Sequence, residues 1–128
     1  MISLSELTHE WLNYARNDLR SAQFMTDMHP TPCEIICFHC QQTVEKALKA
    51  FLIYHRQEPP RTHDLELLWK MCKDLEADFA TYKSDCKRLT QYAVVARYPN
   101  ELQIEVADAK IALKSAAAIL EFVEGLVK

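Results

Sequence analysis

The chain contains a single glycine, Gly125, among 128 residues. Walker-type phosphate loops, dinucleotide-binding fingerprints and most tight hairpin turns need backbone dihedrals that only glycine adopts at little cost. The sequence therefore excludes those nucleotide-binding loops and argues against a sheet built from hairpins. Because 49% of the residues are hydrophobic, a chain of this length can bury a sizeable core with helices alone. We expect one all-helical domain over residues 1–128.

Five helical segments are expected from the spacing of apolar residues and from capping signals. They cover about residues 5–28, 31–55, 62 onward, 78–97 and 100–127. Thr31, Pro32 and Glu34 provide an N-cap, a first-turn proline and a capping-box acid for the second helix, and Asn100 with Gln103 could cap the fifth. Short connections favour an up-down bundle, in which consecutive helices are antiparallel.

The chain has no run of about 18 apolar residues, so no membrane span is expected. Its first residues lack the basic-then-apolar order of a signal peptide, and its five cysteines are an odd number. These features predict free thiols and a cytoplasmic protein. Cys33, Cys37 and Cys40 have the spacing of an iron–sulfur signature, but that signature needs a flexible loop and these residues lie within an expected helix. We interpret them as core residues and expect no metal or other cofactor.

The first expected helix carries an apolar stripe that a carboxylate interrupts. The stripe consists of Leu4, Leu7, Trp11, Tyr14, Ala15, Ala22 and Met25. Asp18 lies within it, and a buried carboxylate needs a cation, which Lys46 or Lys49 of the second helix could provide. Direct contact of these lysines with a ligand is the alternative. The mixed polar and apolar face of the second helix suggests either buried pairing within the bundle or a subunit contact. Together with the apolar fifth helix it favours a subunit contact, which predicts a homodimer.

The net charge is −3, but the basic residues are concentrated in two windows, residues 46–63 and 83–98. In an up-down bundle the second and fourth helices would end where the third and fifth begin. That end would gather Arg56, Arg61, His63, Arg97 and Tyr98 beside two helix N-termini. Such a place suits a phosphate, because donors and positive dipoles already face outward. The alternative is a scatter of solvated surface charge.

His63 is a candidate for proton transfer, because histidine exchanges protons near neutral pH. Arg56, seven residues upstream, could hold a phosphate. Cleavage of RNA without metal needs both groups, a base for the 2′-hydroxyl and a cation for the phosphoryl oxygens. A capping or surface histidine is the alternative interpretation.

Four blocks of the sequence resemble the HEPN domain family. They are Trp11-x2-Tyr14-Ala15-x2-Asp18-Leu19-x2-Ala22, Phe38-His39-Cys40-Gln41-Gln42-x-Val44-Glu45-Lys46-Ala47-Leu48-Lys49-Ala50, Thr62-His63-Asp64-Leu65 and Arg97-Tyr98-Pro99-Asn100. They span nearly the whole chain, and the second block is the most specific. The resemblance implies a small helical bundle, commonly homodimeric and often encoded beside a minimal nucleotidyltransferase.

Members of this family are described as nucleotide-binding modules or as metal-independent endoribonucleases, many of them toxins of toxin–antitoxin pairs. The nucleases carry an arginine, a polar residue and then a histidine, with four to six residues between arginine and histidine. Arg56-x6-His63 fits the outer limit of that spacing and Gln57 is the polar neighbour, although Pro59-Pro60 lies between them.

The resemblance and the basic windows together imply a protein that binds a nucleotide or an RNA phosphate and works with a nucleotidyltransferase. The catalytic candidates are His63 and Arg56, and the phosphate-binding candidates are Arg61, Arg97, Tyr98, Lys46 and Lys49. The alternative is a non-catalytic helical module that binds and regulates a partner protein.

Overall fold

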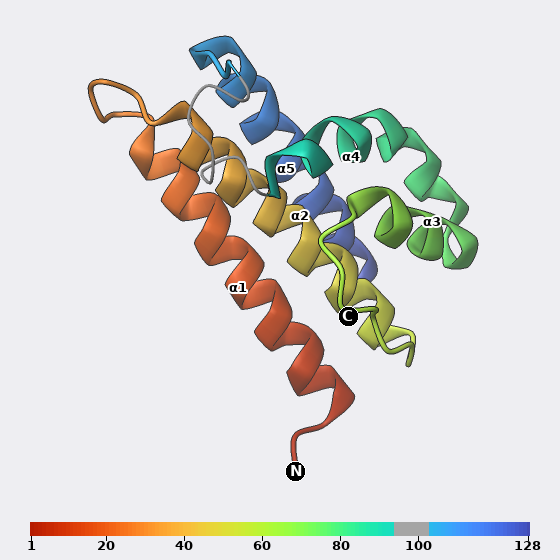
Figure 1. The fold of residues 1–128 in the computed structure, drawn as a ribbon. Coiled ribbons are helices and arrows are strands. Elements are labelled where there is room, and N and C mark those ends of the chain that lie inside the picture. The colour runs from red at the N-terminus through yellow and green to blue at the C-terminus, as the bar shows by residue number, and fades with distance from the viewer. Residues whose placement is uncertain (94–102) are drawn as a thin grey trace.

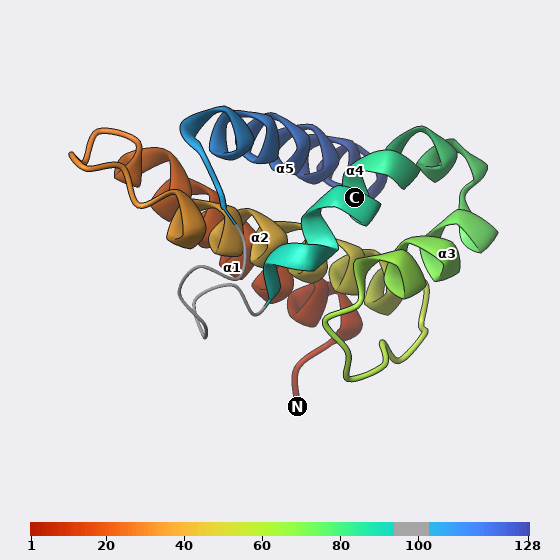
Figure 2. The same ribbon diagram turned by 45° about the horizontal axis from the view of Figure 1, so that its top comes forward.

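Two long antiparallel helices, α1 (Leu4–Met25) and α2 (Cys33–Tyr54), form the hairpin on which the fold is built. In the computed structural model, which describes residues 1–93 and 103–128, α5 (Val106–Leu126) lies along α2 (Figure 1). The shorter α3 (Leu65–Leu75) and α4 (Lys83–Thr90), joined by a 3₁₀ segment η1 (Ala77–Tyr82), form a second pair beside the C-terminal half of α2 (Figure 2). Over the residues that the structure describes, the expected all-helical class with five α-helices is confirmed.

Helix α2 is the centre of the core, with 15 of its 22 residues buried. Alanines on α2 and α5 let the backbones of these helices approach closely, and aromatic rings connect the more distant elements. The ring of Phe79 on η1 lies 4.8 Å from that of Phe51 on α2 and 4.9 Å from that of Phe122 on α5, both edge to face. This ring cluster joins three elements at the C-terminal ends of α2 and α5. Within the described part of the chain, no helix is long and apolar enough to cross a membrane.

The face that α1 buries differs from the expected stripe. The buried residues are Thr8, Leu12, Ala15, Leu19 and Ala22. Leu4 and Tyr14 of the expected stripe are 46% and 61% exposed. Helix α1 has apolar residues on two adjoining faces, and the face with the small Ala15 and Ala22 fits closest to α2. The other face, with Leu4, Leu7 and Trp11, lines the groove that is described below.

Two capping predictions are wrong. Helix α2 begins at Cys33 after Pro32 without a side-chain cap, and the Thr31 hydroxyl donates instead to the Met28 carbonyl, 3.3 Å away. Helix α5 is capped by a capping box of Glu105 and Asp108, not by Gln103; Asn100 lies outside the described residues.

Helices three and four also differ from their expected limits. Helix α3 starts three residues later than expected, with Asp64 as its N-cap. The fourth expected helix, residues 78–97, is a 3₁₀ segment followed by the short α4, and its last residues lie outside the described part of the chain.

The direction of α5 contradicts part of the expected arrangement of helix ends. Helix α5 begins at the end of the bundle where α2 begins, and the two helices run in the same direction (Figure 1). The prediction that α5 begins at the C-terminal end of α2 is wrong, because the expected alternation of helix directions fails after α2. The connection that follows α2 runs back along it, so that the His63 carbonyl contacts Gln41. Helix α4 consequently runs opposite to α2, from η1 beside Phe51 back to Thr90 beside His63.

Candidate functional site

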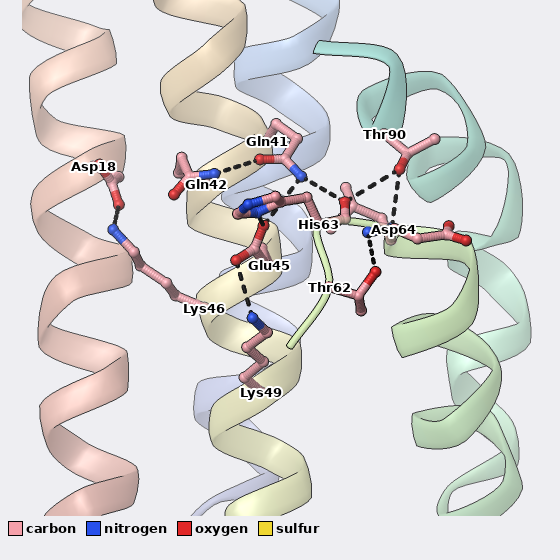
Figure 3. Close-up of polar contacts among 11 residues, drawn as sticks. Asp18, Gln41, Gln42, Glu45, Lys46, Lys49, Thr62, His63, Asp64 and Thr90 are labelled. Carbon is pink, nitrogen blue, oxygen red and sulfur yellow. Dashed lines mark hydrogen bonds and ion pairs between the residues drawn. The ribbon is translucent and has the colours of Figure 1, made fainter. Parts of the chain in front are cut away.

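A row of buried polar side chains runs along the side of α2 that faces the α2–α3 connection. Gln41, Glu45 and Lys49 follow one another at intervals of four residues, so they share one face of the helix. The Glu45 side chain is 6% exposed, and its Oε2 lies 3.1 Å from the Lys49 Nζ. Its Oε1 lies 2.7 Å from the Nδ1 of His63 and accepts a longer hydrogen bond, 3.4 Å, from Gln41 (Figure 3). Glu45 is thus the centre of the row.

The backbone of His63 is held as firmly as its ring. Gln41 donates from Nε2 to the His63 carbonyl over 2.9 Å. The hydroxyl of Thr90, at the end of α4, donates to the same carbonyl and accepts from the Leu65 amide. His63, two residues before α3 begins, is therefore tied to both α2 and α4, although its side chain is 68% exposed.

A second group of the same composition lies between α1 and α2. Asp18 accepts from Lys46 through one carboxylate oxygen and contacts His39 Nδ1 through the other, at 2.9 Å. The Asp18 side chain is only 13% exposed. The prediction that Asp18 pairs with a lysine of the second helix is confirmed for Lys46, whereas Lys49 pairs with Glu45.

A groove of about 620 Å³ opens between α1 and the chain that follows α2. Its walls are mainly apolar and its edge carries two arginines. The lining residues are Leu4, Leu7, Trp11, Lys49, Ile53, Arg56, Gln57, Glu58, Pro59, Pro60 and Arg61. Lys49 Nζ lies 5.8 Å from the centre of the Trp11 ring. Arg56 and Arg61 are exposed, and among residues 1–93 and 103–128 neither forms an ion pair.

Arg56 has a backbone conformation that arginine rarely adopts. Its φ is 62°, in the left-handed region. The amide of Arg56 donates to the Ile53 carbonyl and that of Gln57 to the Leu52 carbonyl, both over 2.9 Å. This is the Schellman motif that ends many helices, whose left-handed position is usually glycine. Helix α2 therefore ends with an arginine at a place where glycine would be less strained.

The structure brings together some of the candidate residues predicted from the sequence. Arg56, Arg61 and Lys49 line the groove, and Lys49 also binds the carboxylate that holds His63. His63 is therefore next to the groove, although it does not line it. Lys46 is bound to Asp18 between α1 and α2. Arg97 and Tyr98 lie outside the described residues.

Sequence reasoning missed Gln41 and Glu45 as partners of His63, and Trp11 as a wall of the groove. The four-residue spacing of Gln41, Glu45 and Lys49 was visible on the second helix. Their partner, however, is 18 residues from Glu45 in the sequence, and no local pattern predicts that contact. Of the two interpretations of the mixed face of the second helix, buried pairing within the bundle holds for Glu45 and Lys49, which are buried and paired with each other.

The cysteines belong to the core, as expected. All five are free and buried. Burial raises the pKa of Cys37, Cys40 and Cys86 to about 12, and that of Cys72 still further. These thiols stay protonated at neutral pH, which is the behaviour of packing residues.

Comparison with known proteins gives a consistent result. The model of the HEPN domain family matches residues 8–126. The crystal structure of TT1696 from Thermus thermophilus is similar with a TM-score of 0.77 and 29% identity, over 92% of this chain and 96% of that one. ST0689, described as an archaeal HEPN homologue, is similar with a TM-score of 0.71 and 25% identity, over 94% of this chain and 98% of the other. No curated protein sequence is significantly similar.

Proposed function

The chain belongs to the HEPN family, and from this premise we propose that it binds phosphate groups of a nucleotide or of RNA in the groove beside α1. The observation that carries the proposal is the pair of exposed arginines, Arg56 and Arg61, at the edge of an apolar groove. A guanidinium group can bind a phosphate through two parallel hydrogen bonds. Neither arginine is occupied by a carboxylate among the described residues, so both charges remain for a ligand.

The apolar walls favour a ligand with a flat organic part beside its anionic part. Trp11 and Ile53 offer surface against which a base or a sugar could pack, since aromatic side chains stack readily on bases. Lys49 contributes less to the binding of an anion, because the Glu45 carboxylate, 3.1 Å from the Lys49 Nζ, already balances its charge. The groove thus favours a nucleotide unit over a free inorganic phosphate.

Metal-independent cleavage of RNA is the second candidate function, and the His63–Glu45 contact favours it. A histidine held by a carboxylate at one ring nitrogen can accept or give a proton at the other. In this version His63 transfers the proton and Arg56 holds the phosphate. This ribonuclease activity would suit the toxin of a toxin–antitoxin pair with a nucleotidyltransferase partner. A non-catalytic module that regulates a partner protein would bind the nucleotide or RNA without cleaving it.

A homodimer is also part of the proposal. Tyr14 and Phe24 are 61% and 78% exposed on α1, and large exposed apolar side chains on one helix are typical of a contact surface. They provide better support for a subunit contact than the second helix, whose polar face is covered.

The test is binding of a fluorescent mononucleotide and of a short single-stranded RNA at low salt. Arg61→Ala should weaken binding about tenfold or more, because a charge-assisted contact contributes about 1.5–3 kcal/mol. Arg20→Ala is the matched control, since Arg20 is exposed on α1, lines a different cavity and carries the same charge. Equal losses in both variants would indicate diffuse attraction, and no binding by the wild type would refute the proposal.

The two candidate functions separate in a cleavage assay with a chelator present. If the protein is a ribonuclease, His63→Ala should lower the cleavage rate about 100-fold or more and leave binding largely intact. In a binding module the wild type has no activity to lose, and the substitution changes affinity only modestly.

A further inference from the structure

We propose that Glu45 is a positioning residue that fixes the tautomer of His63, with the proton on Nδ1 and the lone pair on Nε2. A carboxylate can only accept hydrogen bonds. The Nδ1 of His63 lies 2.7 Å from Glu45 Oε1, so that nitrogen carries the hydrogen. In the neutral ring Nε2 is then unprotonated and can accept a proton. The His63 side chain that carries it is 68% exposed.

The geometry around Glu45 is well suited to this role. Its carboxylate is buried on the central helix, and Lys49 balances the charge from the other oxygen. Gln41, one turn earlier, fixes the His63 backbone through its carbonyl. His63 is therefore held at two points, its backbone carbonyl and its ring Nδ1, by the same face of α2 (Figure 3). A histidine on an otherwise free loop would rotate and would favour the Nε2–H form, as free imidazole side chains do in water.

The catalytic consequence rests on the proposed ribonuclease function. Nε2 takes the proton of an RNA 2′-hydroxyl, and the 2′-oxygen forms a bond to the adjacent phosphorus. The bond from phosphorus to the 5′-oxygen breaks, and that oxygen takes a proton from water. The products are a 2′,3′-cyclic phosphate and a 5′-hydroxyl, and the proton on Nε2 returns to solvent. With the opposite tautomer Nε2 could not accept the first proton.

The chain contains its own control for the role of Glu45. Asp18, Lys46 and His39 repeat the carboxylate–lysine–histidine arrangement between α1 and α2. Asp18→Asn removes the same charge from the same kind of group, but it acts on His39. A general effect of losing a buried carboxylate would appear in both variants, whereas control of His63 is specific to Glu45.

The decisive measurement is the ¹⁵N NMR spectrum of labelled histidine rings in the whole protein, because the shifts of the two ring nitrogens report the tautomer. The signal of His63 is assigned as the one lost in His63→Gln. We expect neutral His63 to be in the Nδ1–H form in the wild type and to move toward the Nε2–H form in Glu45→Gln. Asp18→Asn should change the signals of His39 and leave those of His63 unchanged.

The wild-type spectrum tests the inference without any substitution, so it stays decisive if Glu45→Gln does not fold. Finding neutral His63 in the Nε2–H form would overturn it, as would a folded Glu45→Gln protein with unchanged His63 signals. If the protein cleaves RNA, Glu45→Gln should lower kcat about tenfold or more, because the ring loses the carboxylate that selects its tautomer, with KM within about twofold. A wild type without cleavage refutes the ribonuclease function but leaves the tautomer result to decide the role of Glu45.

Discussion

Replacing Arg56 by glycine should make the protein more stable and worse at binding anions. Arg56 has φ 62° at the end of α2, and left-handed backbone costs a residue with a Cβ atom about 1–2 kcal/mol. Glycine removes that strain but has more freedom in the unfolded chain, which offsets about 0.4–1 kcal/mol. Because the Arg56 side chain is exposed and forms no ion pair among the described residues, little packing is lost. The net gain in the free energy of unfolding should be about 0.5–1 kcal/mol.

Arg56→Ala is the matched control, because it removes the same charge and keeps the strained backbone. Urea unfolding followed by circular dichroism should place Arg56→Gly about 0.5–1 kcal/mol above Arg56→Ala, or roughly 2–4 °C higher in Tm for a chain of this size. Both variants should bind the nucleotide probe about tenfold or more weakly.

The stability measurement tests the backbone strain at Arg56, and the binding measurement tests its contact with phosphate. If Arg56→Gly is no more stable than Arg56→Ala, the left-handed conformation carries no strain in solution. If either variant binds like the wild type, Arg56 does not contact the phosphate. Higher stability with lower affinity is the combination expected of a residue retained for function at a strained position.

Three further predictions concern the core and the surface of α1. Asp18→Ala should cost about 3 kcal/mol, because it leaves the half-buried Lys46 without its partner; a loss below about 0.5 kcal/mol in urea unfolding would contradict the burial of that pair. Phe79→Ala should cost about 3–5 kcal/mol, since its fully buried ring joins α2, η1 and α5; thermal and urea unfolding would both report it, and a loss under about 1 kcal/mol would contradict the ring cluster. Sedimentation should show a dimer at micromolar concentration that Tyr14→Glu or Phe24→Glu weakens; a monomeric wild type would rule out the contact through α1.

The helices could be predicted from the sequence because their signals are local. Apolar spacing predicted α2 to end at about residue 55, and it ends at Tyr54. Local rules fail where two neighbours compete for the same role. On α1 two apolar faces are available, and the choice between them depends on the shape of α2. At the start of α2 the Thr31 hydroxyl turns back to Met28, an alternative that the capping pattern does not exclude.

The candidate site was predicted only in part, because sequence patterns report local features and not contacts between distant residues. Arg56, Arg61 and His63 were recognisable by residue type and by their place in a basic window. Their geometry depends on Glu45, whose role comes from a contact across 18 residues. The direction of α5 was not predictable either, since it depends on the connection after α2, which runs back along that helix, rather than on any signal within α5 itself.

The buried cysteines make this protein able to report its own local opening. Its five thiols are spread over α2, α3 and α4, and none is exposed. Only a thiolate reacts readily with an alkylating reagent, and burial keeps these groups protonated by raising their pKa. Each cysteine can therefore be modified only when its own helix opens. The labelling rates of Cys40, Cys72 and Cys86 would measure the opening free energies of three helices in one experiment, without any introduced probe.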